Sequence, residues 1–209
     1  MKPDRMSMLA FVKDIPNLMT LSGVCCGFLG IYFAIQGNFP AAVIAMLWAV
    51  LLDWYDGPVA RAMPGRSDDL KAFGGKLDSL ADIVSLGVCP AIILLSYGDF
   101  NPWFLPGALA VIMAGVIRLA YFDVFGVDVD GCIAGLSLDI TALVIAPLFL
   151  FEQVSSHNAF AAVLYGVIVV LAMLHVAPFR MKKMVGYWYH VITIYILGLT
   201  AIFSWQIFG

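Results

Sequence analysis

Charged side chains are scarce in this sequence. Asp, Glu, Lys and Arg make up only 12% of its 209 residues, whereas 63% are hydrophobic and the mean hydropathy is +0.98. Soluble domains carry about 25% charged residues. The long apolar segments also lack the polar face of a surface helix, which is typical of helices immersed in lipid. We therefore predict an all-α integral membrane protein, a polytopic bundle of transmembrane helices.

Two further absences exclude classes of site. The cysteines form neither a C-x-x-C pair nor a zinc-ligand spacing, so they predict no cysteine-bound metal and no disulfide framework. They are Cys25, Cys26, Cys89 and Cys132. The Lys and Arg residues are few and dispersed. No nucleic-acid partner is therefore expected.

Seven apolar segments are candidates for membrane spans. They cover residues 16–36, 39–63, 73–97, 102–124, 134–153, 158–178 and 185–207. The short loops between them favour antiparallel neighbours in one bundle. We expect a single domain, residues 1–209, in which residues 1–15 lie at the membrane interface and no cleavable signal is present.

The positive charges predict the orientation of these spans. With seven spans and a cytoplasmic N-terminus, all Lys and Arg residues fall on or near the cytoplasmic side. They are Lys2, Arg5, Lys13, Arg61, Arg66, Lys71, Lys76, Arg118, Arg180, Lys182 and Lys183. Because loops rich in Lys and Arg stay inside, we expect a multi-pass protein of the cytoplasmic membrane.

Four aspartates stand out where the second predicted span ends and the third begins. Asp53 and Asp56 are three residues apart, and Asp78 and Asp82 are four apart, so each pair shares one face of a helix. Carboxylates that face one another repel, and burying them without a counter-charge is costly. Hard divalent cations prefer such oxygen ligands. The spacing therefore predicts a metal site at the cytoplasmic face.

Residues beside the aspartates suit a ligand that carries phosphate. Gly57 and Gly74 remove side chains where a nucleotide could approach the backbone, and the guanidinium of Arg61 matches phosphate. Asn17 opens the first span; it either caps that helix, which we favour, or reaches the nucleotide. With the carboxylates, these residues favour phosphoryl transfer at a paired-metal site.

The same stretch resembles a family signature. It is similar to the CDP-alcohol phosphotransferase motif, D-x2-D-G-x2-A-R followed by G-x3-D-x3-D. Every motif position is present: Asp53, Asp56, Gly57, Ala60, Arg61, Gly74, Asp78 and Asp82. The twelve-residue linker from Ala62 to Phe73 is longer than is usual in the family. The resemblance implies a six-helix core, here residues 16–178, with an extra C-terminal span at 185–207, and a homodimer.

Within this family the chain is most similar to bacterial and archaeal phosphatidylserine synthases. The first span (PNLMTLSGVCCGF) and the start of the third (LDSLADIVSLGVCPA) carry this resemblance. It implies transfer of a phosphatidyl group from CDP-diacylglycerol to L-serine, with CMP as the other product. It further implies two divalent ions, Mg²⁺ or Mn²⁺, one held by Asp53, Asp56 and Asp78 and one by Asp53, Asp78 and Asp82. Asp82 would be the general base, and Gly57, Ala60, Arg61 and Gly74 would frame the CDP moiety.

Two residues are candidates for binding the acceptor. Arg118 lies in the fourth predicted span, where an Arg indicates function by default, and the segment RLAYF resembles a segment of the serine synthases. That resemblance implies a pocket for the serine carboxylate. Asp139 enters the fifth span; it either meets the amine of serine or ethanolamine or pairs only with Arg118.

A basic cluster ends the sixth predicted span. It comprises His175, Arg180, Lys182 and Lys183. We favour a stop-transfer cluster that meets anionic lipid; the alternative is a share in binding the substrate phosphates.

Other functions stay open at this point. Within the family, ethanolamine, glycerol phosphate, inositol phosphate or choline could replace serine as the acceptor. A cation transporter that uses intramembrane carboxylates is a distant alternative, because the acids cluster at one face and no inverted repeat is evident.

Overall fold

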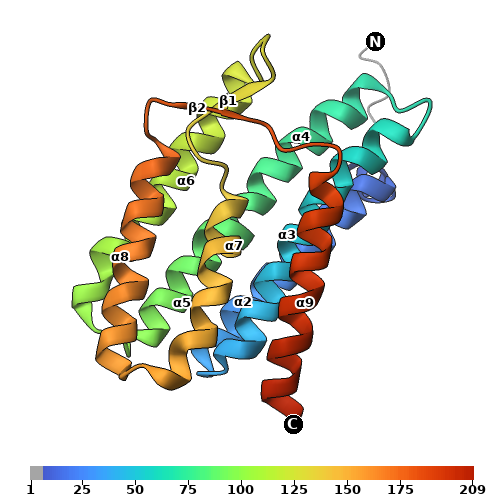
Figure 1. The fold of residues 1–209 in the computed structure, drawn as a ribbon. Coiled ribbons are helices and arrows are strands. Elements are labelled where there is room, and N and C mark those ends of the chain that lie inside the picture. Colours follow the sequence, from blue (N-terminus) through green and yellow to red (C-terminus); the bar gives the residue numbers. More distant parts are fainter. Residues whose placement is uncertain (1–6) are drawn as a thin grey trace.

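Long helices run side by side through the protein (Figure 1). The computed structural model describes residues 7–209, so Lys2, Arg5 and the start of the predicted interfacial segment lie outside the described residues. The elements are α1 (Met8–Val12), α2 (Ile15–Ile35), α3 (Phe39–Ala62), α4 (Asp68–Asp82), η1 (Ile83–Val88), α5 (Cys89–Tyr97), η2 (Pro102–Phe104), α6 (Leu105–Phe125), β1 (Cys132–Ala134), α7 (Asp139–Leu148), η3 (Phe149–Val154), α8 (His157–His175), β2 (Arg180–Lys182) and α9 (Trp188–Phe208).

The predicted membrane bundle is confirmed. Within residues 7–209, six helical segments are long and apolar enough to cross a membrane. They are Ile15–Ile35, Phe39–Ala62, Asp68–Tyr97, Pro102–Phe125, His157–His175 and Trp188–Phe208. These segments correspond to six of the predicted spans, including the C-terminal one, and the chain is a multi-pass membrane protein.

The segment predicted to span at residues 134–153 is shorter than expected. Its helix α7 has 10 residues and gives way to η3, a 3₁₀ helix of 6 residues. Pro147 lies inside α7 near this change, and a proline removes a backbone hydrogen bond and disfavours further α-helix. Together α7 and η3 extend about 27 Å, against about 30 Å for the hydrocarbon core. A count of seven spans stays a prediction.

Local capping fixes where the two motif helices begin. Asn38 accepts the backbone N–H of Ala41 at 3.2 Å at the start of α3. Ser67 accepts the N–H of Leu70 at 3.3 Å and so ends the long linker and starts α4. Each cap satisfies one of the free N–H groups of a helix N-terminus. The two caps therefore fix the first residues of α3 and α4, the helices that carry the motif aspartates.

The helix that carries the second aspartate pair changes its winding directly after that pair. Asp82 is the last residue of α4, and the π-helical segment η1 follows before α5 continues the same span. Helix α2 packs closely against η1 here. A Cβ on Gly27 of α2 would lie only 2.5 Å from the Ser85 Oγ of η1. Ser85 also donates to the Gly23 carbonyl at 3.2 Å. A π-segment of this kind frequently lies at a functional site.

A small sheet, which the sequence pattern did not predict, joins two distant loops. Strands β1 and β2 pair antiparallel with Ile133 opposite Met181. Arg180 pairs with Asp128 and lies 3.5 Å from Asp130. The backbone N–H of Cys132, which donates at 2.9 Å, and the Arg180 guanidinium hold the pKa of Asp128 below its usual range. The sheet thereby fixes the α6–α7 loop against the α8–α9 loop.

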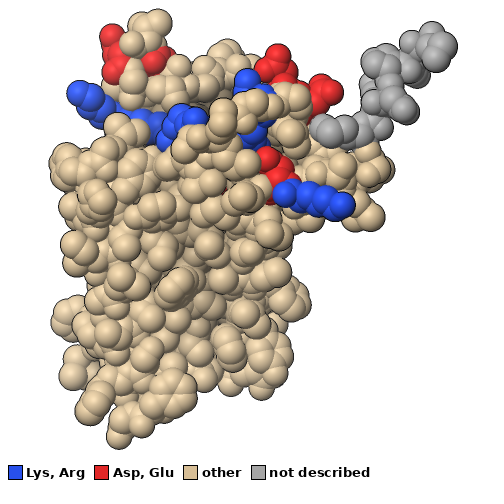
Figure 2. All heavy atoms as spheres, turned by 90° about the vertical axis from the view of Figure 1, so that its right-hand side faces the viewer, with Lys and Arg blue, Asp and Glu red and all other residues tan. Residues whose placement is uncertain are grey.

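Charge is distributed unevenly along the bundle. On the face drawn in Figure 2, the Lys, Arg, Asp and Glu side chains gather at one end of the molecule and the rest of that face is uncharged. Figure 1 places β1, β2 and the start of α4 at the same end. This agrees with the expectation that the basic residues lie on one side of the membrane.

Candidate active site

Three of the four motif aspartates converge near this charged end. Asp53 comes from α3, and Asp78 and Asp82 are one turn apart on α4. One carboxylate oxygen from each lies within 4.8 Å of the others. The Asp78 Oδ1 is buried and has no hydrogen-bond partner in the part of the chain that the structure describes. Convergent carboxylate oxygens, one of them unsatisfied, fit a hard divalent cation, so the cluster could bind a metal ion.

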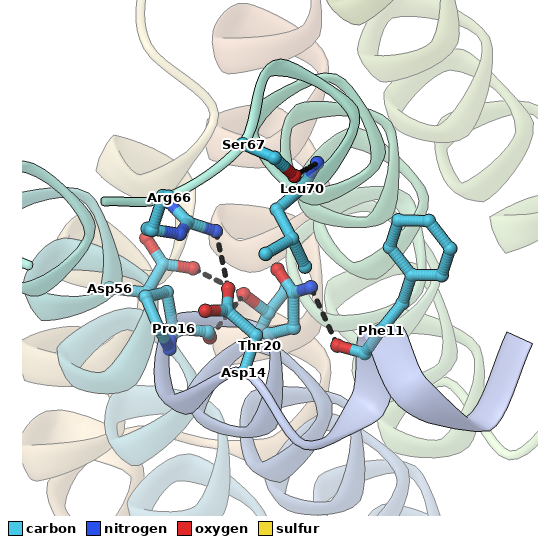
Figure 3. A network of polar contacts seen from close by, with 9 residues as sticks. Phe11, Asp14, Pro16, Thr20, Asp56, Arg66, Ser67 and Leu70 are labelled. Atoms are coloured by element: carbon cyan, nitrogen blue, oxygen red, sulfur yellow. Dashed lines mark hydrogen bonds and ion pairs between the residues drawn. The ribbon is translucent and has the colours of Figure 1, made fainter. Parts of the chain in front are cut away.

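Asp56 lies outside this group of three and is held by a neighbour. The Thr20 Oγ donates to the Asp56 Oδ2 at 2.5 Å, and both side chains are buried (Figure 3). A short hydrogen bond to a carboxylate fixes its orientation. Sequence reasoning missed Thr20. The available signal was its position three residues after Asn17 in an apolar helix, which puts both polar side chains on one face.

Two cavities meet at the aspartates. The first, about 180 Å³, is lined mainly by α3, α4, α6 and the segments around β1, α7 and β2. The second, about 210 Å³, is lined by α2, the end of α3, the linker and α4. We call them the α6-side cavity and the α2-side cavity. Both are lined by Asp56, Gly57, Arg61 and Asp78, so ligands in the two cavities would reach the same carboxylates.

The α2-side cavity contains all the residues expected to frame the CDP moiety: Asn17, Gly57, Ala60, Arg61 and Gly74. The glycines have a further role that the sequence did not indicate. A Cβ on Gly57 would lie 3.3 Å from the Arg61 Nη1, and a Cβ on Gly74 would lie 2.8 Å from the Asn17 Oδ1. The missing side chains therefore make room for the chain's own polar groups at the cavity wall.

The favoured interpretation of Asn17 as a helix cap is wrong. Helix α2 begins at Ile15, so Asp14 occupies the N-cap position and Asn17 lies inside the first turn. The Asn17 amide donates to the Phe11 carbonyl at 2.9 Å, and its side chain is buried. Asn17 thus ties α1 to α2 and contributes to the cavity wall.

Arg66 is a cavity residue that sequence reasoning missed. It lies in the long linker, lines the α2-side cavity and pairs with Asp14 at 2.5 Å (Figure 3). Both side chains are almost fully buried, with 8% and 6% exposed. No motif position falls on Arg66, so the tertiary structure alone reveals it. With Arg61 and Lys71 it is one of three cationic residues in the lining of this cavity.

The α6-side cavity contains both residues expected to bind the acceptor. Arg118 is buried and donates to the Ser137 Oγ at 3.4 Å. Asp139 is buried as well, and its Oδ2 accepts the Trp54 indole N–H at 2.8 Å. Among residues 7–209 no ion pair joins Arg118 to Asp139, and the Arg118 Nε and the Asp139 Oδ1 have no hydrogen-bond partner. The alternative in which Asp139 only pairs with Arg118 is therefore not what the structure contains.

The side chains of the basic cluster at the end of α8 do not lie on one common surface. Lys183 lines the α6-side cavity, and its Nζ lies 5.6 Å from the centre of the Phe122 ring. Arg180 is engaged by Asp128. His175 is 1% exposed and hydrogen-bonded inside the bundle, so its inclusion in a lipid-facing cluster was wrong.

Comparison with known proteins agrees with the motif. A family model described as CDP-alcohol phosphatidyltransferase matches residues 13–205. Archaetidylserine synthase of Methanothermobacter thermautotrophicus is 36% identical over 137 residues, which are 65% of this chain and 58% of that protein. CDP-diacylglycerol–serine O-phosphatidyltransferase of Bacillus subtilis is 32% identical over 112 residues, 53% of this chain and 61% of that protein. The Mycobacterium tuberculosis protein of the same name is 39% identical over 114 residues, which are 54% of this chain and 38% of that protein. Each match covers less than two thirds of the relative.

Proposed function

The chain belongs to the CDP-alcohol phosphatidyltransferase family, and from this premise we propose that it makes phosphatidylserine. The phosphatidyl group of CDP-diacylglycerol would pass to L-serine, and CMP would leave. One observation carries the proposal: two cavities with different linings share two of the motif aspartates, Asp56 and Asp78. A donor and an acceptor held in the two cavities can approach the same carboxylates, which provides the proximity that a two-substrate reaction needs. The names of the similar serine and archaetidylserine synthases support serine as the acceptor.

The aspartates would hold two divalent ions, Mg²⁺ or Mn²⁺. Asp53, Asp56 and Asp78 would hold one, as the family resemblance implies, and Asp53, Asp78 and Asp82 the other. The close oxygens of Asp53, Asp78 and Asp82 support the second site, and the unsatisfied Oδ1 of Asp78, a residue common to both sites, supports metal binding there. Such ions neutralise a diphosphate and stabilise charge on the attacking and leaving oxygens.

Asp82 would act as the general base. The serine hydroxyl oxygen attacks the phosphorus that carries the diacylglycerol, and its proton passes to the Asp82 carboxylate. The bond between this phosphorus and the oxygen that bridges to the CMP phosphate breaks, and CMP leaves with that oxygen. Asp82 suits the role because it lines the α6-side cavity one turn deeper than Asp78. Alignment with the hydroxyl, rather than high basicity, would make it effective.

The two cavities divide the substrates between them. The α2-side cavity, with Asn17, Gly57, Ala60, Arg61 and Gly74, would take the CDP moiety, because its cations match a diphosphate.

The α6-side cavity would take serine. Arg118 would bind the carboxylate and Asp139 the ammonium group, since each has a buried polar atom without a partner among the described residues. A zwitterion satisfies both residues, whereas ethanolamine leaves Arg118 unmatched and glycerol phosphate leaves Asp139 unmatched.

The setting of the site is part of the proposal. Residues 1–209 would form one domain of seven spans in the cytoplasmic membrane, with the aspartates at the cytoplasmic face where CDP-linked substrates bind. The gathering of Lys and Arg at the aspartate end supports this orientation. A homodimer is proposed from family membership.

The decisive experiment measures CMP release by the purified protein in detergent. CDP-diacylglycerol and Mg²⁺ or Mn²⁺ are supplied, and serine or each rival alcohol is added separately. We expect release with serine, and loss of release in Asp78→Asn. Release only with another alcohol would retain the family reaction and reject serine, and no release with any alcohol would reject the reaction. Full turnover by Asp82→Asn would reject Asp82 as the base.

A further inference from the structure

A buried histidine connects the three segments around the acceptor side of the site. His175 is the last residue of α8 and is 1% exposed. Its Nδ1 lies 3.0 Å from the Leu136 carbonyl oxygen, and its Nε2 lies 2.7 Å from the Thr141 Oγ. Leu136 belongs to the turn before α7, and Thr141 is in the first turn of α7. One imidazole ring therefore joins α8 to both the turn and the helix.

The partners of the ring fix its tautomer. A carbonyl oxygen can only accept a hydrogen bond, so the Nδ1 must carry the proton that it shares with Leu136. In a neutral ring the Nε2 then accepts, and the Thr141 hydroxyl donates to it. Both ring nitrogens are satisfied in this way, as a buried histidine requires.

Backbone contacts bring the same turn against the end of α8. The Gly135 N–H donates to the Phe179 carbonyl at 2.9 Å, and the Leu136 N–H donates to the Leu174 carbonyl at 3.0 Å. Gly135 has a positive φ of 66°, and a Cβ there would lie 2.1 Å from the His175 carbonyl oxygen. No other residue fits at this position without moving the turn.

The residues held by His175 adjoin the acceptor-binding pair. Ser137, next to Leu136, accepts a hydrogen bond from Arg118 at 3.4 Å. Asp139 lies two residues before Thr141 at the start of α7. The ring is thus one residue from the partner of Arg118 and less than one helical turn from Asp139.

We propose that His175 is a positioning residue for the acceptor: it holds Ser137 and Asp139 in the places from which Arg118 and Asp139 bind the alcohol substrate. This inference rests on the proposed function for the identity of the acceptor. His175 itself lies outside the linings of both cavities, so it acts through Leu136 and Thr141 and not by contact with substrate. The donor side of the site, built from α2, α3 and α4, does not depend on it.

The test separates acceptor binding from donor binding. CMP release is measured for His175→Ala over a range of serine at saturating CDP-diacylglycerol, and then over a range of CDP-diacylglycerol at saturating serine. We expect the KM for serine to rise about tenfold, the effect of losing hydrogen bonds that hold a charged binding group, with the KM for CDP-diacylglycerol within about twofold of wild type. His175→Gln keeps one donor and one acceptor and should recover part of the loss. His157→Gln, an exposed histidine beside Asp99, is the matched control and should leave both constants unchanged.

A second pair of variants, at Thr141, tests the same hydrogen bond in case His175→Ala does not fold. Thr141→Val keeps the shape of the side chain and removes the hydroxyl, whereas Thr141→Ser keeps the hydroxyl. Thr141→Val should raise the KM for serine and Thr141→Ser should not. An unchanged KM for serine in Thr141→Val and His175→Gln, or an equal rise in both KM values, would overturn the proposal while serine turnover by the wild type stands. If the wild type uses another alcohol, the same measurements apply to that alcohol. If it uses none, the proposed function and this inference both fall.

Discussion

The α2-side cavity is lined only by residues between Pro16 and Asp78, whereas the lining of the α6-side cavity extends from Asp53 to Tyr189. The first is therefore assembled by helices that follow one another in the chain. The second needs α3, α4, α6, α7 and the loop before α9 to meet. The two cavities share Asp56 and Asp78 but differ in how much of the fold they depend on.

The two cavities also differ in the charged residues that line them. The α2-side cavity contains Arg61, Arg66 and Lys71 and suits a highly charged diphosphate. The α6-side cavity sets Arg118 against Asp139 and suits a small molecule that carries both charges. Under the proposed function, the site for the donor would be encoded in one contiguous motif. The residues that select the acceptor would lie on distant segments, so the acceptor could change without altering the motif.

The largest effect is expected where the two cavities meet. Asp78→Asn should lower CMP release about a thousandfold with every acceptor, because a bound metal supplies several kcal/mol of charge stabilisation in the transition state. Asp69→Asn makes the same change at an exposed position of α4 and should retain wild-type turnover. Near-normal release by Asp78→Asn would show that the reaction centre does not lie between the cavities.

On the acceptor side, Arg118→Lys should separate the two substrates. Lysine keeps the charge but loses the planar set of donors that matches a carboxylate, so the KM for serine should rise by about tenfold to a hundredfold. The KM for CDP-diacylglycerol should stay near the wild-type value. Arg180→Lys, on the exposed strand β2, serves as the control. A rise in the donor KM alone would reverse the assignment of the cavities.

The hydrogen bond to Asp56 should tune metal affinity. Thr20→Val removes the donor that orients this carboxylate and should weaken the affinity for Mn²⁺ about tenfold, at the low end of such effects. The measurement is Mn²⁺ binding followed by electron paramagnetic resonance, together with the Mn²⁺ dependence of CMP release. The Ser22 hydroxyl donates to the Leu18 carbonyl of its own helix and to no other group in residues 7–209. Ser22→Ala should therefore bind Mn²⁺ like the wild type. Equal affinities in both variants would remove Asp56 from the metal site.

The smallest effect is expected on the donor side, from a glycine of the cavity wall. A Cβ on Gly74 would meet the Asn17 Oδ1 at 2.8 Å, whereas a Cβ on Gly166, an exposed position of α8 outside both cavities, would meet nothing within 4 Å among the described residues. Gly74→Ala should raise the KM for CDP-diacylglycerol about fivefold, because even small overpacking displaces a held side chain. Gly166→Ala should leave that KM unchanged and stabilise α8 by about 1 kcal/mol. Similar kinetics for both variants would argue against Asn17 as part of the donor pocket.

Features set by spacing along one helix could be predicted from the sequence. Asp78 and Asp82 are four residues apart, so any helix brings them to one face, and the apolar composition alone predicts the bundle. The ends of the helices were predicted less accurately. Asn17 was placed at a helix start because Pro16 precedes it, yet the helix begins at Ile15. The predicted span at 134–153 contains a shorter helix, which begins only at Asp139 and gives way to a 3₁₀ helix two residues after Pro147.

The sequence by itself therefore determined the class of protein, the family and the motif aspartates that converge, because all of these depend on composition or on spacings within one or two helices. Only the tertiary structure decided that Thr20 holds Asp56, that Arg66 enters the α2-side cavity, and that Asp139 bonds to Trp54 instead of pairing with Arg118. It also decided the place of His175, which joins α8 to a turn 39 residues away. Such contacts depend on how whole helices pack, and no local pattern encodes that packing.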